Sequence, residues 1–172
     1  MTLNLNNYTF VFKKSLVMLV VFSLLASFFA FPYKAKAVDT VIFLTSTSES
    51  SWTVPSDWTS TNSIEVIGGG GGGGDNGGGG GGGGGYSKVS NVTLTPGASV
   101  TYAVGAGGAE ATAGGDTYFC DSTSNCASLG GTAVIVGADA GFAGGSTGAA
   151  GSGGVAGVGV GNVTRNGGNG GS

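Results

Sequence analysis

The stretch EVIGGGGGGGDNGGGGGGGGGYSKV, from Glu65 to Val89, decides the fold of this chain. Residues 68–85 are all glycine except Asp75 and Asn76. A segment with almost no side chains cannot supply acid–base groups, and it cannot form an ordinary apolar core. Either the segment is a flexible spacer, or its main chain is itself the building material of the domain.

The composition excludes most enzyme chemistry. The chain has 172 residues, which is enough for one domain, and glycine supplies 39 of them. Charged residues make up only 9%, and there is no histidine. A Ser-His-Asp triad, a Cys-His pair and a His-ligated metal site are therefore excluded. No base, nucleophile and orienting group can be assembled, so we expect a protein that is not an enzyme and needs no cofactor.

The N-terminus has the organisation of an export signal. A basic pair precedes the apolar stretch 15–31, and Ala37 ends an Ala-Lys-Ala sequence of the small-x-small type. These features predict a signal peptide over residues 1–37, with cleavage between Ala37 and Val38 and a secreted or cell-surface product. The alternative is an uncleaved membrane anchor, since the apolar stretch is near the lower length limit of a membrane span.

Cleavage at that point leaves an acidic chain. Only Lys88 and Arg165 remain as cations, against the nine Asp and Glu residues. Phosphate binding requires cationic side chains, so we expect neither nucleic acid nor an anionic membrane surface as a partner. The oligomeric state is left open.

The segment 38–67 is predicted to be β structure. Residues 40–46 are rich in β-branched side chains, and a turn at residues 55–57 separates two further short strands. In the second of these, Ile64 and Val66 share one face and Glu65 lies on the other. Trp52, Val54 and Trp58 are expected to cover one side of a small sheet.

A β-hairpin is predicted after the glycine run. Its strands would be residues 86–94 and 99–104, joined by a turn at the Thr-Pro-Gly-Ala sequence 95–98. Alternation in the return strand predicts that one of its faces is buried. A further short apolar strand is expected within residues 130–137.

Glycine also recurs at every third residue near the C-terminus. The positions are Gly145, Gly148, Gly151, Gly154 and Gly157. A period of three implies a backbone with three residues per turn, as in polyproline II. Without proline, that conformation is the polyglycine-II helix, and such helices need neighbouring chains as hydrogen-bond partners.

The glycine runs 68–74 and 77–85 are accordingly predicted to form two polyglycine-II rods. Asp75 and Asn76 lie where the chain would reverse, because both residue types favour turns. A third rod from Gly145 would complete a bundle or a two-layer stack. The predicted fold is therefore mainly β with no helix after the signal segment: a small antiparallel β region plus stacked polyglycine-II helices over 68–172. The alternatives are a disordered glycine-rich tether and, more weakly, a collagen-like chain.

The order of motifs resembles that of a known family. The motifs are SWTVPSDWTSTNSIEVIGGGGGG (51–73), GGGGGGYSKVSNVTLTPGASVTYAVGAGG (80–108), GGDTYF (114–119) and GGNGG (167–171). Together they resemble the glycine-rich domain of bacterial surface proteins and phage tail-fibre adhesins, over about residues 50–172. The resemblance implies stacked polyglycine-II helices whose tip loops bind a receptor.

Two features depart from the family pattern. Cys120 and Cys126 are inserted where the pattern has none, and the chain stops at GGNGGS where relatives continue. The second departure leaves a C-terminally truncated fragment as one interpretation. In an exported chain the two cysteines are expected to form a disulfide bond, because zinc would need four ligands.

Few side chains are candidates for binding. Tyr118, Phe119 and Phe142 lie between glycine tracts, so they are candidate tip contacts for a cell-surface glycan or protein receptor. The alternative is that they cap the ends of the glycine layers. We expect no metal site. A calcium site is the weaker alternative, because several acidic residues could supply oxygen ligands: Asp75, Glu110, Asp116, Asp121 and Asp139. The expected function is adhesion or display, and the alternative is a purely structural envelope component.

Overall fold

The computed structural model describes residues 18–19, 39–155 and 159–172. The signal peptide predicted for 1–37, its cleavage site between Ala37 and Val38, and Gly157 of the three-residue repeat lie outside the described residues, apart from Met18 and Leu19. Two compact units are distinguished, Met1–Ile42 and Phe43–Ser172. The second unit contains every strand described below.

The described part of the second unit is mainly β, and residues 43–155 and 159–172 contain no helix. The strands are β1 (Ser50–Thr53), β2 (Ser63–Ile67), β3 (Tyr86–Ser90), β4 (Ser99–Ala103), β5 (Thr117–Cys120), β6 (Val134–Ala138) and β7 (Val163–Arg165). They form two antiparallel sheets, a four-stranded sheet in the order β1-β4-β5-β6 and a three-stranded sheet in the order β2-β3-β7. The expectation of a small antiparallel β region is confirmed.

The apolar core joins residues from both sheets. Val54, Val100, Phe119 and Val136 are nearly inaccessible to solvent, and Val66 of β2 packs in the same cluster. The predicted alternation in β2 is confirmed, because its even-numbered residues turn inward while Glu65 is exposed. The cluster is small, and burial of each such side chain contributes about 1.5–3 kcal/mol.

Aromatic rings close the core beside β1. The ring of Trp52 lies edge-on to both Trp58 and Phe119, with centroids 5.7 Å and 5.6 Å away. The Trp58 indole N–H also donates a hydrogen bond to the Val92 carbonyl oxygen. Trp52, Val54 and Trp58 thus cover one side of the sheet, as the sequence predicted.

The predicted hairpin 86–94/99–104 is wrong. The turn at residues 95–98 exists, since Ala98 N–H donates to the Thr95 carbonyl oxygen and Gly97 has a φ of 78°. However, β3 ends at Ser90, and Asn91 takes a positive φ of 59°. The chain then crosses between the sheets, so β3 pairs with β2 and β7 while β4 pairs with β1 and β5.

Two other strand predictions need correction. Residues 40–46 form no strand, and Val41 and Phe43 are exposed. β4 was expected to bury one face, yet Val100, Thr101, Tyr102 and Ala103 are all buried, because β4 lies inside its sheet and is covered on both faces. The apolar strand expected within 130–137 is confirmed as β6.

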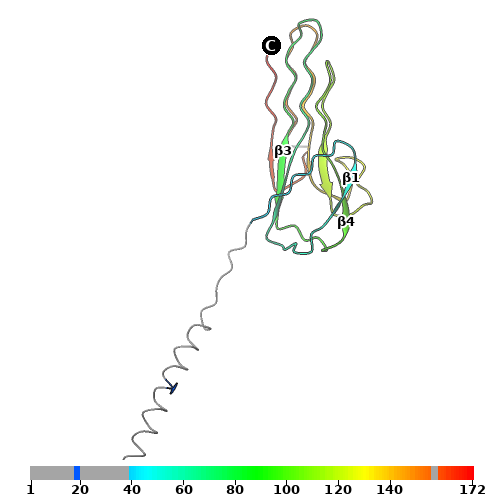
Figure 1. The fold of residues 1–172 in the computed structure, drawn as a ribbon. Helices are drawn as coiled ribbons and strands as arrows, with labels where there is room; N and C mark the ends of the chain where they lie inside the picture. Colours follow the sequence, from blue (N-terminus) through cyan, green and yellow to red (C-terminus); the bar gives the residue numbers. More distant parts are fainter. Residues whose placement is uncertain (1–17, 20–38, 156–158) are drawn as a thin grey trace, which may run out of the picture. The chain divides into compact units, whose positions relative to one another are not determined.

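The glycine runs extend from one end of the strands as wavy, nearly parallel segments (Figure 1). The chain reverses at Asp75 and Asn76 as predicted: Asn76 has a φ of 50°, and Gly78 N–H donates to the Asp75 carbonyl oxygen at 2.8 Å. On the two sides of this reversal, hydrogen bonds recur at every third residue, from the N–H groups of Gly68, Gly71 and Gly74 to the carbonyl oxygens of Gly85, Gly82 and Gly79.

The same three-residue spacing links further segments into two layers. Layer 1 contains the segments 105–111, 68–74, 77–85 and 167–171, in that spatial order. Layer 2 contains 112–115, 139–145 and 149–154. Hydrogen bonds cross between the layers, for example from Gly69 N–H to the Gly115 carbonyl oxygen and from Gly79 N–H to the Gly145 carbonyl oxygen.

The repeat that begins at Gly145 is not one straight rod. Gly148 has a φ of 80°, and Gly145 N–H donates to the Ala149 carbonyl oxygen, so the chain reverses there. Gly145 ends one segment of layer 2, and Gly151 and Gly154 belong to the next one. Gly148 allows this turn, whereas Gly151 and Gly154 allow neighbouring main chains to approach closely.

Candidate functional site: the two faces of the glycine layers

Close approach between main chains explains most glycines in the layers. A Cβ atom at Gly71 would fall 2.1 Å from the Phe142 carbonyl oxygen, and one at Gly82 would fall 2.0 Å from that of Ser152. Real Cβ atoms do not occupy such positions, and the clashing atoms are main-chain atoms that cannot move independently. Glycine at these positions is therefore required by the packing of one layer on the other.

The solvent-facing side of layer 1 is formed by glycine except at Glu110, which is exposed and lies three residues after Gly107. One residue in three points away from layer 2, and these residues are Gly70, Gly73, Gly80, Gly83, Gly107, Gly168 and Gly171. A Cβ atom at Gly73 would come no closer than 3.7 Å to another atom, and one at Gly168 would meet nothing within 4 Å. We call this surface the glycine face.

The solvent-facing side of layer 2 carries side chains instead. We call it the side-chain face; its exposed members are Ala113, Phe142, Ala149 and Ser152, together with Val155, which directly follows the segment 149–154. Phe142 is 49% exposed and Val155 is 47% exposed. Ala149, Ser152 and Val155 each directly follow a glycine of the three-residue repeat, and this spacing is the signal in the sequence that marks the side-chain face.

The structure places the three candidate aromatic residues in different environments. Tyr118 and Phe119 are buried in β5, where Phe119 is part of the main core cluster. The expectation that these two rings project from exposed tips is therefore wrong: the sequence Thr-Tyr-Phe-Cys forms a strand covered on both faces. Phe142 is exposed, but it lies within the segment 139–145 of layer 2, away from any reversal.

Burial also affects the Tyr118 hydroxyl. Desolvation raises its pKa above the ordinary value, and the nearby Glu49 carboxylate raises it further. Tyr118 thus stays neutral, and its role is one of packing.

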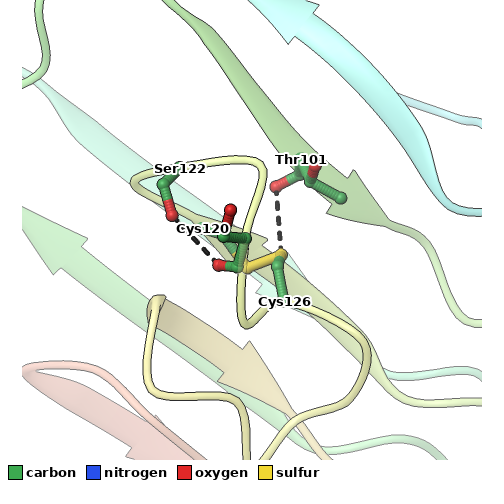
Figure 2. The surroundings of a disulfide bond; sticks show 5 residues. Thr101, Cys120, Ser122 and Cys126 are labelled. Atoms are coloured by element: carbon green, nitrogen blue, oxygen red, sulfur yellow. Dashed lines mark hydrogen bonds between the residues drawn. A yellow bond between two sulfur atoms is a disulfide. The ribbon is translucent and has the colours of Figure 1, made fainter.

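The predicted disulfide bond is present between Cys120 and Cys126 (Figure 2). Both cysteines are buried, and the Cys126 sulfur lies 3.6 Å from the Thr101 carbonyl oxygen on β4. Main-chain hydrogen bonds also hold the enclosed loop, from Thr101 N–H to the Ser122 carbonyl oxygen and from Asp121 N–H to that of Ala133. The disulfide fixes the loop against the four-stranded sheet.

Two carboxyl groups lie at the junction between the strands and the glycine layers. Asp116 precedes β5 and Asp139 follows β6, one position beyond the Thr117–Ala138 pair. Asp116 Oδ1 accepts a hydrogen bond from Ala140 N–H at 3.0 Å, and Asp139 Oδ2 accepts one from Val155 N–H at 3.3 Å. Desolvation raises the pKa of Asp116, and the neighbouring Asp139 raises it further against the opposing effect of Ala140 N–H.

The described residues contain no group of three His, Cys, Asp or Glu side chains that is able to hold a metal ion. The Asp116 and Asp139 carboxylates accept hydrogen bonds from the Ala140 and Val155 amides, at the base of the layer-2 segments 139–145 and 149–154. Nor does any described helix have the length and apolar character needed to cross a bilayer.

Both cations of the second unit lie on the outer face of the three-stranded sheet. Lys88 Nζ is 2.8 Å from Glu65 Oε1 on the adjacent strand. The hydrogen bond from Lys88 lowers the pKa of Glu65, and the same bond raises the pKa of Lys88. Arg165 stands opposite Tyr86 on β7 and donates to the carbonyl oxygen of its own neighbour, Thr164.

A family model described as "Glycine-rich domain" matches residues 45–172. The chain belongs to this family. The match covers both sheets and both glycine layers, so the glycine-rich domain is the whole unit and not the glycine runs alone. No curated protein and no solved structure shows significant similarity to the chain.

Proposed function

We propose that this glycine-rich domain is an exported, non-enzymatic module for adhesion or display at a cell surface. In this proposal the glycine segments are polyglycine-II helices, and the two layers form a stiff slab that presents the side-chain face to a glycan or protein receptor. The observation that carries the proposal is the contrast between the two layers: both are held together by main-chain hydrogen bonds, but the exposed large apolar side chains, Phe142 and Val155, lie on the layer-2 side.

The polyglycine-II assignment is supported by the spacing of the bonds. N–H groups that are three residues apart in one segment donate to the same neighbouring segment. For example, the N–H groups of Gly79, Gly82 and Gly85 all donate to carbonyl oxygens of the segment 139–145. A backbone with three residues per turn presents equivalent groups in one direction at that interval. The close Cα approach also permits weak Cα–H···O contacts between segments.

Receptor binding is supported by the exposed Phe142 and Val155. Large exposed apolar side chains among glycine and small residues are candidate anchors, since a few residues, aromatic ones among them, carry most of the binding energy of many interfaces. Ser152, in the adjacent segment, would add a hydroxyl for hydrogen bonding to a sugar. Export is supported by the sequence features of residues 1–37 and by the disulfide bond, which persists in oxidising compartments.

The proposal is tested with Phe142→Ala in the full-length protein. Attachment to an array of cell-surface glycans and to receptor-bearing cells is measured, and at least a tenfold loss of binding is expected, as for the loss of a hot-spot side chain of about 1.4 kcal/mol or more. Ile67→Ala is the matched control, because Ile67 is 63% exposed but belongs to the outer face of β2, with Glu65, and not to the side-chain face. Equal binding by all proteins would favour the purely structural role.

The tether alternative is tested separately by hydrogen exchange of the glycine amides. The stacked arrangement predicts slow exchange at Gly71 and Gly82, which are bonded between segments, whereas Gly77 exchanges fast. Uniformly fast exchange over 68–85 would rule out the stiff slab.

A further inference from the structure

The chain contains the dipeptide Asn-Gly at three positions: Asn76–Gly77, Asn166–Gly167 and Asn169–Gly170. This dipeptide is chemically labile, because the glycine amide nitrogen can attack the asparagine side-chain carbonyl carbon without hindrance from a side chain. The attack requires a glycine nitrogen that is free to move and whose proton is not held by an acceptor. The three positions differ sharply in this respect.

Two of the dipeptides are locked into the glycine layers. Gly167 N–H donates to the Gly154 carbonyl oxygen and Gly170 N–H donates to that of Gly151, both at 2.9 Å. Their main chain is also packed tightly, since a Cβ atom at Gly167 would fall 1.9 Å from the Gly83 carbonyl oxygen and one at Gly170 would fall equally close to that of Gly80. Attack by either nitrogen would require the edge segment of layer 1 to detach.

The side chain of Asn169 is held as well. Its Oδ1 accepts a hydrogen bond from Gly153 N–H at 3.1 Å. This hydrogen bond restrains the Asn169 side-chain amide against the segment 149–154.

The third dipeptide is free of these constraints. Asn76 and Gly77 are exposed at the reversal between two segments of layer 1, and a Cβ atom at Gly77 would meet nothing within 4 Å. Within the described part of the chain, no acceptor receives the Gly77 N–H and no partner holds the Asn76 side chain. The positive φ values of Asn76 and Gly77 mark a tight turn whose main chain is bonded only on either side, through Gly78 and Gly74.

We propose that Asn76 is a site of spontaneous deamidation. The Gly77 nitrogen forms a bond to Asn76 Cγ, the bond from Cγ to Nδ2 breaks, and ammonia leaves with the proton from Gly77 N–H. Water then opens the cyclic imide. Cleavage of the bond from nitrogen to Cγ gives aspartate, and cleavage of the bond to the main-chain carbonyl carbon gives isoaspartate. The net reaction is amide plus water to acid plus ammonia.

The modification would change the distal end of layer 1. It places a second carboxylate directly beside Asp75 on an already acidic chain, which strengthens local repulsion of acidic partners. Isoaspartate also adds a carbon atom to the main chain inside the turn that is closed by the bond from Gly78 N–H to the Asp75 carbonyl oxygen. The deamidated protein is thus expected to have a looser reversal while the strands stay unchanged.

The experiment incubates the full-length protein at mildly alkaline pH and maps deamidation and isoaspartate at each site by peptide mass spectrometry, together with ammonia release. Asn76 is expected to react about tenfold faster than Asn166 or Asn169, or more, since opening even one or two main-chain hydrogen bonds costs about a factor of ten. Incubation in denaturant supplies the reference, in which the three sites should react at similar rates.

Two variants complete the test. Asn76→Gln is expected to abolish the fast ammonia release, because the longer side chain forms its cyclic imide slowly, while Asn169→Gln leaves the fast release intact. The proposal is overturned if Asn76 survives in the native protein as long as Asn166 and Asn169 do, or if the native and denatured proteins show the same distribution among the three sites.

Discussion

Gly72 packs directly against the main chain of Ala109, so closely that a Cβ atom at position 72 would lie 1.7 Å from the Ala109 carbonyl oxygen. The next residue, Gly73, also has a glycine on either side in the sequence. A Cβ atom at position 73, however, would come no closer than 3.7 Å to another atom. Two adjacent glycines in an unbroken run therefore have different physical roles. One is required by packing, and the other faces solvent on the glycine face.

This contrast predicts opposite effects of the same substitution. Gly72→Ala should destabilise the protein by about 1–3 kcal/mol or more, because two main chains must move apart. Gly73→Ala should be neutral or stabilising by about 0.4–1 kcal/mol, since alanine restricts the unfolded chain. Urea unfolding of both variants measures the difference, and equal destabilisation would contradict the layer arrangement.

Buried hydroxyl groups give a second matched pair. Ser87 on β3 is 1% exposed, and among the described residues its Oγ has no hydrogen-bond partner. Ser87→Ala removes an unsatisfied polar atom, so the free energy of unfolding should be unchanged or rise by about 1 kcal/mol.

Thr117 is the matched control for Ser87. Its Oγ1 donates to the Ile67 carbonyl oxygen and accepts from Gly105 N–H, which ties the sheets to layer 1. Thr117→Val should cost about 2 kcal/mol or more, because both main-chain groups lose their partner. If thermal unfolding ranks Ser87→Ala below Thr117→Val in stability, this interpretation of the two hydroxyls is wrong.

The raised pKa of Asp116 predicts a pH-dependent stability. A carboxyl group whose pKa is higher in the folded state than its usual 3.8 binds its proton more tightly when folded. Its unfavourable contribution is absent below pH 3.8 and grows as the pH rises through the folded pKa. Between pH 3.8 and the folded pKa, the wild type should therefore lose stability relative to Asp116→Asn. The side-chain oxygen of the variant still accepts the hydrogen bond from Ala140 N–H.

Urea unfolding across a pH series measures this effect. The two proteins should have similar stabilities at the acid end, and the variant should be the more stable one at neutral pH. A constant difference at every pH would indicate that Asp116 does not titrate differently in the folded protein. Asp57→Asn is a suitable control, since Asp57 lies in the exposed turn after β1.

The disulfide bond should contribute moderately to stability. Cys120 and Cys126 are separated by 6 positions, and closing so short a loop is worth about 2 kcal/mol in the chain-entropy model. The double variant Cys120→Ala/Cys126→Ala should unfold at a lower temperature by a corresponding amount while keeping both sheets. Because both sulfurs are buried, reductant should act on the native protein slowly and on the urea-unfolded protein quickly.

The sequence by itself determined those features that depend on neighbouring residues. The reversal at Asp75 and Asn76 follows from local turn chemistry. The alternation in β2 follows from the period of two, and the pairing of Cys120 with Cys126 required only a short loop. Close stacking of glycine segments was also predictable, because only backbones without side chains can approach so closely.

Only the tertiary structure decided which segments meet. The strand after the glycine run pairs with β2 and β7 instead of β4, and Tyr118 and Phe119 enter the core instead of a tip. Gly72 and Gly73 are identical in sequence, yet one faces Ala109 and the other faces solvent. These outcomes depend on contacts between residues far apart in the chain, whose free energy is shared over the whole packed structure and leaves no local signal in the sequence.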